Sequence, residues 1–359
     1  MPFTPGTLWP DTSGTHINAH GGGLLYHGGR YYWYGEHKVA GRLGNSAQVG
    51  VHVYSSANLL DWDDEGIALA VSDDPGSEIV RGSVIERPKV IFCAATGRFV
   101  MWFHLELMGH GYRAARSGVA VSSSPVGPFE YLGSCRPDAG VWPLNAEPEQ
   151  CRPLSAEEQA FVDSVHTPGG PVPDYRGDLI FRRDFAGGQM ARDMTLFVDD
   201  DGAAYHVFAS EENGTLHISR LSDDYLSHAG QWVRALPGEF NEAPAIFRHD
   251  GRYWMFSSGC TGWKPNPGRL AVADSIMGPW TALGNPCVGT PEQLADTFES
   301  QSTYVIPVVG REGAFIFAAD RWRPDDAIDG RYVWLPVIFR DGQPELHWHD
   351  SWDLSVFDA

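Results

Sequence analysis

Polar residues recur at one position in five similar segments of this chain, and their types are those used in acid–base catalysis. Each stands just before or inside a short apolar run. They are Asn18 and His20, Glu86 and Arg87, Arg192 and Asp193, Glu242, and Glu299 and Gln301. Burying several carboxyl groups together costs desolvation and repulsion energy unless a function maintains them. The coincidence therefore predicts a functional ring, although each residue alone also has a structural reading as an ion pair or a turn cap.

Two or three carboxyl groups in an acidic pocket with aromatic neighbours suit the hydrolysis of glycosidic bonds. One carboxyl group with a raised pKa would protonate the leaving oxygen, and a second group would activate water on the opposite face. Trp263 stands in the loop GCTGWKPN, where a large aromatic side chain has little packing reason to be. We expect it to stack on a sugar. Glu36, Glu211 and Arg321 are further candidates for substrate contact.

The elements that would position these groups are five copies of a strand, a tight turn and a second strand. Each copy alternates β-branched and aromatic residues on either side of a Gly or Asp-Gly turn, which is typical of a β-hairpin. The copies are residues 23–36, 88–104, 195–208, 243–257 and 303–318. A single hairpin cannot bury its own apolar faces, so the repeats must stack.

A second hairpin follows four of these copies, at residues 51–66, 118–133, 216–230 and 270–284. Two hairpins make one four-stranded propeller blade. The fifth blade would end with residues 332–340 and 345–353, assisted by the N-terminal segment. The sequence thus predicts an all-β fold, a five-bladed β-propeller that uses residues 1–359 as one domain. The Pro-, Gly- and acid-rich stretch 134–183 is an insertion between blades two and three, with a short helix expected around residues 155–165.

Composition limits the partners. The formal net charge is −20, which argues against nucleic acid or an anionic membrane surface as a partner. No apolar stretch approaches the ~20 residues of a membrane helix, and the five cysteines lack a zinc-binding spacing. Cys135 and Cys151 lie near enough in sequence to pair, but free thiols are expected. The segment MPFTPGTLWPD has no features of a signal peptide, which predicts a cytoplasmic protein; a chain whose signal had been removed would look the same.

Two segments resemble glycoside hydrolase family 43, whose fold is the five-bladed propeller, and the resemblance covers nearly the whole chain outside residues 134–183. RDMTLFVDDDGAAY is similar to the third-blade motif of the family, which implies that Asp193 orients the acid and tunes its pKa. NEAPAIFRHDGRYW is similar to the fourth-blade motif, which implies that Glu242 is the proton donor.

The first blade departs from the family, because INAHGGG holds no carboxylate where most members carry a general-base Asp. Together with ERPKVIF and SQSTYV, this resembles the branch of the exo-β-1,3-galactanases. In that branch a Glu and a Gln, here Glu86 and Gln301, lie in the site, and the Gln is taken to replace the base, as an imidic acid. Two carboxylates are rival candidates for the base. One is Glu299, which stands two residues before Gln301 and is therefore expected on the same face of the strand; the other is Glu86.

The resemblance implies an inverting, exo-acting hydrolase that releases galactose from β-1,3-galactan or arabinogalactan. A β-galactofuranosidase or α-L-arabinofuranosidase of the same fold is an alternative, and so is a catalytically silent sugar-binding propeller, which the missing Asp suggests. The sequence contains no cofactor-binding motif. A structural Ca²⁺ in the channel, present in parts of the family, is the one metal that the resemblance raises.

Overall fold

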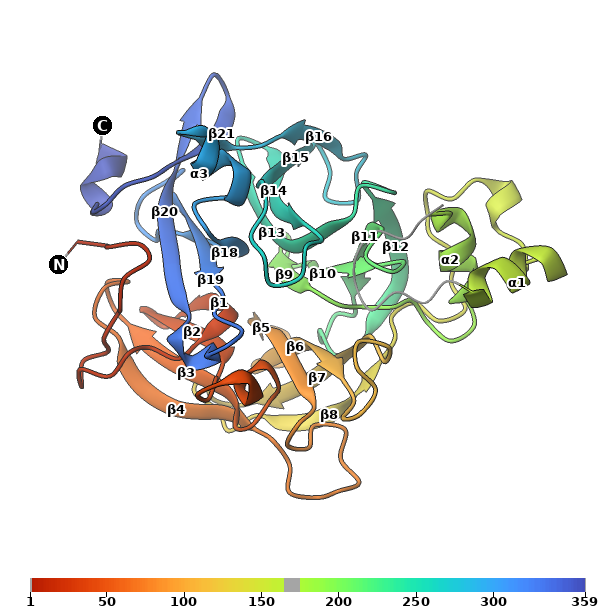
Figure 1. Ribbon diagram of the computed structural model, residues 1–359, viewed down its shortest axis with the longest axis horizontal. Helices are drawn as coiled ribbons and strands as arrows, with labels where there is room; N and C mark the ends of the chain where they lie inside the picture. Colours follow the sequence, from red (N-terminus) through yellow and green to blue (C-terminus); the bar gives the residue numbers. More distant parts are fainter. Residues whose placement is uncertain (1, 165–174, 359) are drawn as a thin grey trace.

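The computed structural model describes residues 2–164 and 175–358, and these residues form five sheets arranged around a common centre (Figure 1). Four sheets have four antiparallel strands, and the fifth has a short additional strand. The predicted five-bladed β-propeller is confirmed.

The strands follow one another along the chain, with four in each of the first four blades. Blade one contains β1 (His20–His27), β2 (Arg30–Glu36), β3 (Gly50–Ser56) and β4 (Asp63–Ala70). Blade two contains β5 (Val84–Cys93), β6 (Arg98–Glu106), β7 (Arg116–Ser122) and β8 (Glu130–Cys135). Blade three contains β9 (Met194–Val198), β10 (Ala204–Ser210), β11 (Thr215–Leu221) and β12 (His228–Ala235).

Blade four contains β13 (Asn241–His249), β14 (Arg252–Gly259), β15 (Arg269–Ala273) and β16 (Thr281–Gly284). Blade five contains β17 (Cys287–Val288), β18 (Gln301–Pro307), β19 (Phe315–Arg321), β20 (Arg331–Arg340) and β21 (Gln343–His347). The α-helices are α1 (Ala156–Ser164), α2 (Gly177–Arg183) and α3 (Pro291–Asp296). Short 3₁₀ helices are η1 (Arg42–Asn45), η2 (Pro148–Gln150), η3 (Ala327–Asp329) and η4 (Leu354–Asp358).

The first strand of each blade is the innermost one. Each first strand contacts the first strands of the two neighbouring blades, and the ring closes between β18 and β1. A separate apolar cluster fills each of the five interfaces between neighbouring blades. Trp62, Trp102, Trp232 and Trp334 are each fully buried in or beside these layers. The hairpins therefore bury their apolar faces by stacking, as their repetition predicts.

Blade five closes the ring with help from both ends of the chain. Phe3 and Trp352 exchange two backbone hydrogen bonds, of 2.7 and 3.0 Å, and their rings stack at 4.3 Å. The strand expected at residues 345–353 ends at His347, and Trp352 instead pairs with the N-terminal segment. A further strand, β17, comes from the linker after blade four and pairs in parallel with β21. Sequence reasoning did not foresee it.

The described parts of the insertion, residues 134–164 and 175–183, lie outside the ring beside blade three (Figure 1). The insertion begins within the last strand of blade two and contains η2, α1 and α2. The helix expected at residues 155–165 is confirmed as α1, whereas α2 was not predicted; residues 165–174 of the insertion are outside the described part of the chain. Leu144 bonds the backbone of Trp232, which attaches the insertion to blade three. Cys135 and Cys151 are free thiols.

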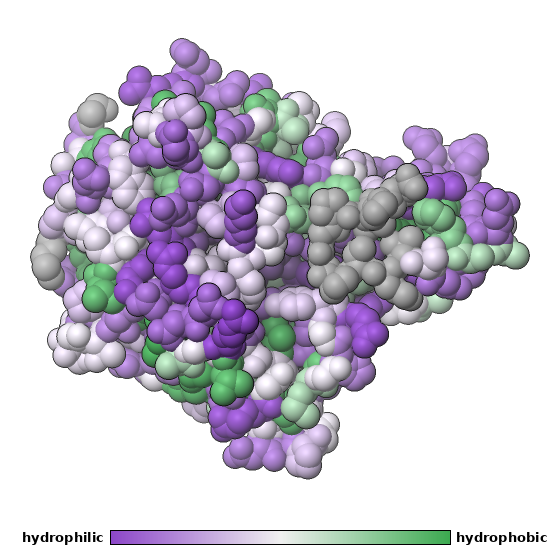
Figure 2. Space-filling model, viewed as in Figure 1, coloured by the Kyte–Doolittle hydropathy of each residue, from purple (hydrophilic) through white to green (hydrophobic). Residues whose placement is uncertain are grey.

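The surface agrees with the acidic composition. The face shown in Figure 2 is mainly hydrophilic, with small, separate apolar areas. Among residues 2–164 and 175–358, every helix is too short or too polar to span a bilayer.

Candidate active site

A cavity of about 240 Å³ opens where the innermost strands begin. It brings together eight of the residues singled out from the sequence: Glu36, Glu86, Arg87, Arg192, Asp193, Glu242, Trp263 and Gln301. These residues come from all five blades or from the loops that join their strands. The predicted ring of polar groups therefore exists as a common lining, although some of its expected members lie elsewhere.

A backbone irregularity repeated between blades aims several of these side chains. The pairing register shifts directly after His20 in β1, after Glu86 in β5 and after Glu242 in β13. The next residues, Gly21, Arg87 and Ala243, have φ of 61°, 55° and 52°. A bulge of this kind bends a strand and re-aims the side chain beside it. Positive φ is costly for Arg and Ala, and such strain is concentrated at functional sites.

Arg87 connects three blades inside the cavity. Its Nη2 donates to Oδ2 of Asp193 at 2.8 Å and to Oε1 of Gln301 at 2.7 Å, and Nη1 donates to the carbonyl of Ser302 at 3.1 Å. The guanidinium lies over the ring of Trp322, 5.2 Å from the ring centroid. These contacts hold the side chains of blades two, three and five in one arrangement.

Glu242 has the properties of a proton donor. Burial, aided by the nearby charge of Asp193, raises the pKa of Glu242 to about 8. Oε1 of Glu242 accepts a 2.7 Å hydrogen bond from Nδ2 of Asn213. Asp193 is itself held by Arg87 and by the backbone amide of Ala243, which donates to its Oδ2 at 3.1 Å. Asp193 therefore lies beside both Glu242 and Arg87, and its charge contributes to the raised pKa of Glu242.

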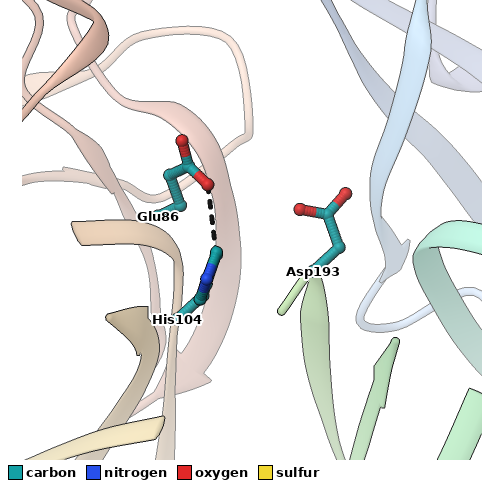
Figure 3. A group of neighbouring side chains, drawn as sticks. All are labelled: Glu86, His104 and Asp193. Carbon is teal, nitrogen blue, oxygen red and sulfur yellow. Dashed lines mark hydrogen bonds and ion pairs between the residues drawn. The ribbon is translucent and has the colours of Figure 1, made fainter. Parts of the chain in front are cut away.

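Glu86 is kept ionised by a buried chain of charged groups. Burial alone would raise its pKa, but the hydrogen bond and charge of His104 lower the pKa of Glu86 to about 2. Nδ1 of His104 lies 3.1 Å from Oε2 of Glu86, and Nε2 lies 3.0 Å from Oε1 of Glu106. Tyr112 donates its hydroxyl to Oε1 of Glu86 at 2.7 Å. Figure 3 shows Asp193 facing this pair from the neighbouring blade.

Glu86, His104 and Asp193 bring potential ligand atoms within 4.8 Å of one another, so we tested their fit to a metal ion. Both ring nitrogens of His104 face carboxylates, and although burial opposes it, these bonds raise the pKa of His104 to about 9. An imidazole that donates from both nitrogens has no lone pair for a metal. Ca²⁺ moreover requires six to eight oxygen ligands. This group therefore does not fit a resident metal ion.

Gln301 is fixed by hydrogen bonds at both ends of its amide. Oε1 accepts from Nη2 of Arg87 at 2.7 Å and from Nε1 of Trp322 at 2.8 Å, and Nε2 donates to the hydroxyl of Ser258 at 2.9 Å. Two N–H donors on one side require the oxygen to face them. The amide orientation follows from this chemistry.

Two aromatic residues and a buried acid complete the cavity. Trp263 is 37% exposed and meets Trp322 edge to face, with 5.6 Å between the ring centroids. Such a partly exposed indole at the cavity edge is suited to stacking on a sugar. Glu36 is buried, forms a 2.6 Å ion pair with Lys38 and accepts from the backbone amide of Arg87. Burial raises the pKa of Glu36.

Two sequence candidates from the start of blade one, His20 and Asn18, lie outside the cavity and make structural contacts. His20 is buried against Asp320, with 3.2 Å between Nδ1 and Oδ1, and stacks on Tyr332. The side-chain amide of Asn18 makes two 2.8 Å hydrogen bonds with the backbone of Lys38. Neither residue lines the cavity.

Glu211 lies inside the protein, bound by both Nε and Nη2 of Arg234 at 2.6 and 2.7 Å and by His217 at 2.8 Å. It has no exposed side-chain surface. Arg321 donates to the carbonyl of Phe298 and lies over the ring of Trp348. The interpretation of these two residues as substrate contacts finds no support in their positions.

Glu299 does not share a strand face with Gln301, and that expectation is wrong. Strand β18 begins only at Gln301, and Thr297, Phe298 and Glu299 all have positive φ. The side chain of Glu299 is 61% exposed, and its carboxylate lies 3.7 Å from Nε of Arg321. It does not line the cavity that contains Gln301.

Three lining side chains were missed: His104, Tyr112 and Asn213. His104 lies on the second strand of its blade, and the other two lie in loops. They do not occupy the repeated position before an innermost strand. Asn213 follows Glu211 and Glu212, and all three have positive φ. A left-handed run of this kind cannot be read from sequence, so no signal pointed to Asn213.

Comparisons with known proteins agree with this geometry. The family model described as glycosyl hydrolases family 43 matches residues 156–303. A solved family 43 β-1,3-galactosidase, in complex with galactodeoxynojirimycin, is 49% identical, with 98% of this chain and 100% of that chain covered and a TM-score of 0.90. The chain belongs to glycoside hydrolase family 43. The predicted resemblance is confirmed, and this family 43 protein is a glycoside hydrolase.

Two further structures are similar to this family 43 chain. An exo-β-1,3-galactanase from Phanerochaete chrysosporium, solved with β-1,3-galactotriose, is 30% identical, covers 98% of this chain and 68% of its own, and has a TM-score of 0.77. An exo-β-1,3-galactanase from Clostridium thermocellum is 34% identical, with coverages of 98% and 66% and a TM-score of 0.77. A sequence comparison with curated proteins gives no match.

Proposed function

We propose that this enzyme removes terminal galactose from β-1,3-linked galactans, with inversion at the anomeric carbon. The observation that carries the proposal is one cavity that contains a carboxyl group with a pKa near 8, Glu242, and a carboxylate kept ionised, Glu86. Groups whose environments separate their pKa values in this way mark the acid and the base of a hydrolase. The substrate class follows from the β-1,3-galactosidase and exo-β-1,3-galactanases to which the chain is similar.

The cavity supports exo action. Its volume of about 240 Å³ is below the roughly 300–1,000 Å³ of pockets for drug-sized ligands. Such a cavity suits one sugar unit, the terminal one, rather than several units of a chain passing through. Trp263 at its edge offers an aromatic surface to that sugar or to the next.

Glu242 donates the proton in this mechanism. The carboxyl group is protonated at neutral pH because burial raises its pKa to about 8. When the glycosidic bond breaks, the proton passes from the carboxyl to the leaving oxygen, and Asn213 keeps the group oriented through its 2.7 Å hydrogen bond.

Hydrogen-bond capacity favours Glu86 over Gln301 as the acceptor of the proton from water. An amide oxygen has two lone pairs, and those of Gln301 face Arg87 and Trp322. A carboxylate has about four acceptor positions, of which Tyr112 and His104 occupy two on Glu86. An imidic form of Gln301 would also direct an O–H at two N–H donors. We therefore assign Glu86 to take the proton and Gln301 to position water; the assignment of Gln301 as the base, made from sequence, stays a prediction.

The test is hydrolysis of β-1,3-galactobiose followed by proton NMR of the first-formed sugar. We expect galactose to appear first as the α-anomer, because water attacks the face opposite the leaving group. Nitrophenyl glycosides of galactopyranose, galactofuranose and arabinofuranose, measured in parallel, identify the sugar, and Glu242→Gln is the matched inactive control. A β-anomer as the first product, or cleavage of the furanosides alone, would refute the proposal.

A further inference from the structure

A second cavity lies beside the first and is rich in arginine. Its volume is about 570 Å³, more than twice that of the first. The two cavities share Tyr112 and Arg192 in their linings. The loop between β6 and β7 contributes Arg113, and the end of α2 contributes Arg183. The second cavity, which we call the arginine cavity, thus lies between blade two and the insertion.

Three of the arginines share two buried carboxylates. Asp184 accepts from Nε and Nη2 of Arg183 at 2.8 and 2.9 Å and lies 3.8 Å from Nη1 of Arg136. Glu212 lies 3.1 Å from Arg183 and 3.4 Å from Arg192. Two negative charges therefore face three positive ones.

Arg113 adds a fourth positive charge to the arginine cavity. It is exposed, and its Nε donates to the carbonyl of His110 at 3.3 Å. Within the described part of the chain, no carboxylate forms an ion pair with it. Asp163, the remaining acid of the lining, is exposed and accepts from Gln159. The arginine cavity is therefore locally cationic in a chain of net charge −20.

A chain of hydrogen bonds places the arginine cavity on the side of the general acid. Nη1 of Arg192 donates to Oδ1 of Asn213 at 3.2 Å, and Nδ2 of Asn213 donates to Glu242 at 2.7 Å. The acid stands next to the oxygen of the leaving group. The part of the glycan beyond the broken bond is consequently directed toward Arg192.

We infer that the arginine cavity binds a carboxylate-bearing sugar carried by the leaving part of the glycan. The inference rests on the proposed function and specifies its substrate: a β-1,3-galactan whose galactose next to the cleaved bond carries a uronic acid. Guanidinium groups match carboxylates in a bidentate geometry. A volume of about 570 Å³ gives room for a sugar unit. An acidic protein surface would otherwise repel such a substrate.

The test compares two derivatives of β-1,3-galactobiose that differ in one group. One carries a glucuronosyl unit on O6 of the reducing galactose, and the other carries a glucosyl unit, which has CH₂OH in place of the carboxylate. At low ionic strength we expect kcat/KM to be about tenfold higher for the carboxylated substrate. The preference should decrease with added salt, because salt screens the arginine charges.

Variants locate the effect. Arg113→Gln should bring the ratio of kcat/KM for the carboxylated substrate to kcat/KM for the glucosyl substrate close to one, while leaving kcat/KM for the glucosyl substrate unchanged. Arg113→Glu should reverse the preference. Arg136→Gln should also reduce it; Arg136 donates to the carbonyls of Arg113 and Ala114, so its thermal unfolding is measured as well. Arg252→Gln, at an exposed arginine 3.5 Å from Asp274, is the matched control and should keep the preference.

The possible failures can be told apart. Equal rates on the two substrates in the unmodified enzyme would overturn this inference and leave the proposed function intact. A preference that survives in Arg113→Gln and Arg136→Gln would overturn it as well, because the carboxylate would then bind elsewhere. If the enzyme hydrolyses neither derivative and does not hydrolyse β-1,3-galactobiose either, the proposed function is refuted instead.

Discussion

Asp193 and Gln301 accept hydrogen bonds from the same nitrogen atom, Nη2 of Arg87, at 2.8 and 2.7 Å. They come from blades three and five, and Arg87 comes from blade two. The relative position of the side chains that surround the substrate thus depends on one guanidinium. A site assembled from separate blades needs such a connection, because the apolar layers join each blade only to its two neighbours.

Arg87→Lys should therefore impair catalysis without unfolding the protein. Lysine keeps the charge but cannot direct a planar fork at Asp193, Gln301 and the Ser302 carbonyl together. We expect kcat/KM on β-1,3-galactobiose to fall about 10- to 100-fold, the equivalent of one charged hydrogen bond of ~1.5–3 kcal/mol. Arg252→Lys, on the exposed face of blade four, serves as the control. An Arg87→Lys enzyme of normal activity would contradict this role.

The raised pKa of Glu242 predicts a basic limit to activity. A general acid works only while protonated, so kcat/KM should stay level from the pH at which Glu86 ionises up to about pH 8 and fall as pH rises through about 8. Glu242→Gln should lose about 10²–10⁴ in kcat and show no such limb. The pH profile of kcat/KM reports the pKa in the free enzyme. A limb that persists in Glu242→Gln would assign it to another group.

Azide distinguishes the two candidate bases. In Glu86→Ala the carboxylate that takes the proton is gone, so we expect kcat to collapse and to recover when azide replaces water as the nucleophile. Gln301→Ala should cost only the ~1–3 kcal/mol of a lost polar contact, with no recovery. Measuring kcat for both variants with and without azide decides between them. Recovery in Gln301→Ala alone would establish the assignment made from the sequence.

His104 should control the acidic limit. His104→Gln removes the cation between Glu86 and Glu106, so only Lys38 and Tyr112 still oppose the effect of burial, and the pKa of Glu86 rises from about 2. The acidic limb of kcat/KM should move to higher pH, while the basic limb near 8 stays in place. A purely structural role would lower activity at every pH alike. Thermal unfolding at pH 7 confirms that the variant is folded.

Sequence reasoning recovered the propeller because a β-hairpin is a local signal that repeats. Glu86, Asp193, Glu242 and Gln301 were found for the same reason, since each precedes or begins an innermost strand. The repeat gives no information about site residues that lie elsewhere in a blade. His104 acts through contacts at both ring nitrogens, which only the fold brings together.

One physical cause explains why Glu299 and Glu211 lie outside the cavity. Glu299 was placed on the face of Gln301 by a strand period, but three successive residues of positive φ end that period before the strand begins. Glu211 likewise carries a positive φ, and its carboxylate turns inward to Arg234. Backbone conformation in a left-handed run depends on tertiary contacts, so residue type alone does not show where such a side chain points.

The pairing of Phe3 with Trp352 has a consequence for synthesis on the ribosome. The apolar layer between blades one and five contains Phe3, Trp33, Trp334 and Trp352, so it needs residues from both ends of the chain. Until the last of these leaves the exit tunnel, blade one has no partner on one side and its tryptophans face water. Exposed apolar surface of this kind makes incomplete chains prone to aggregation. A nascent chain that stalls before blade five is thus expected to depend on chaperones, even with four blades already made.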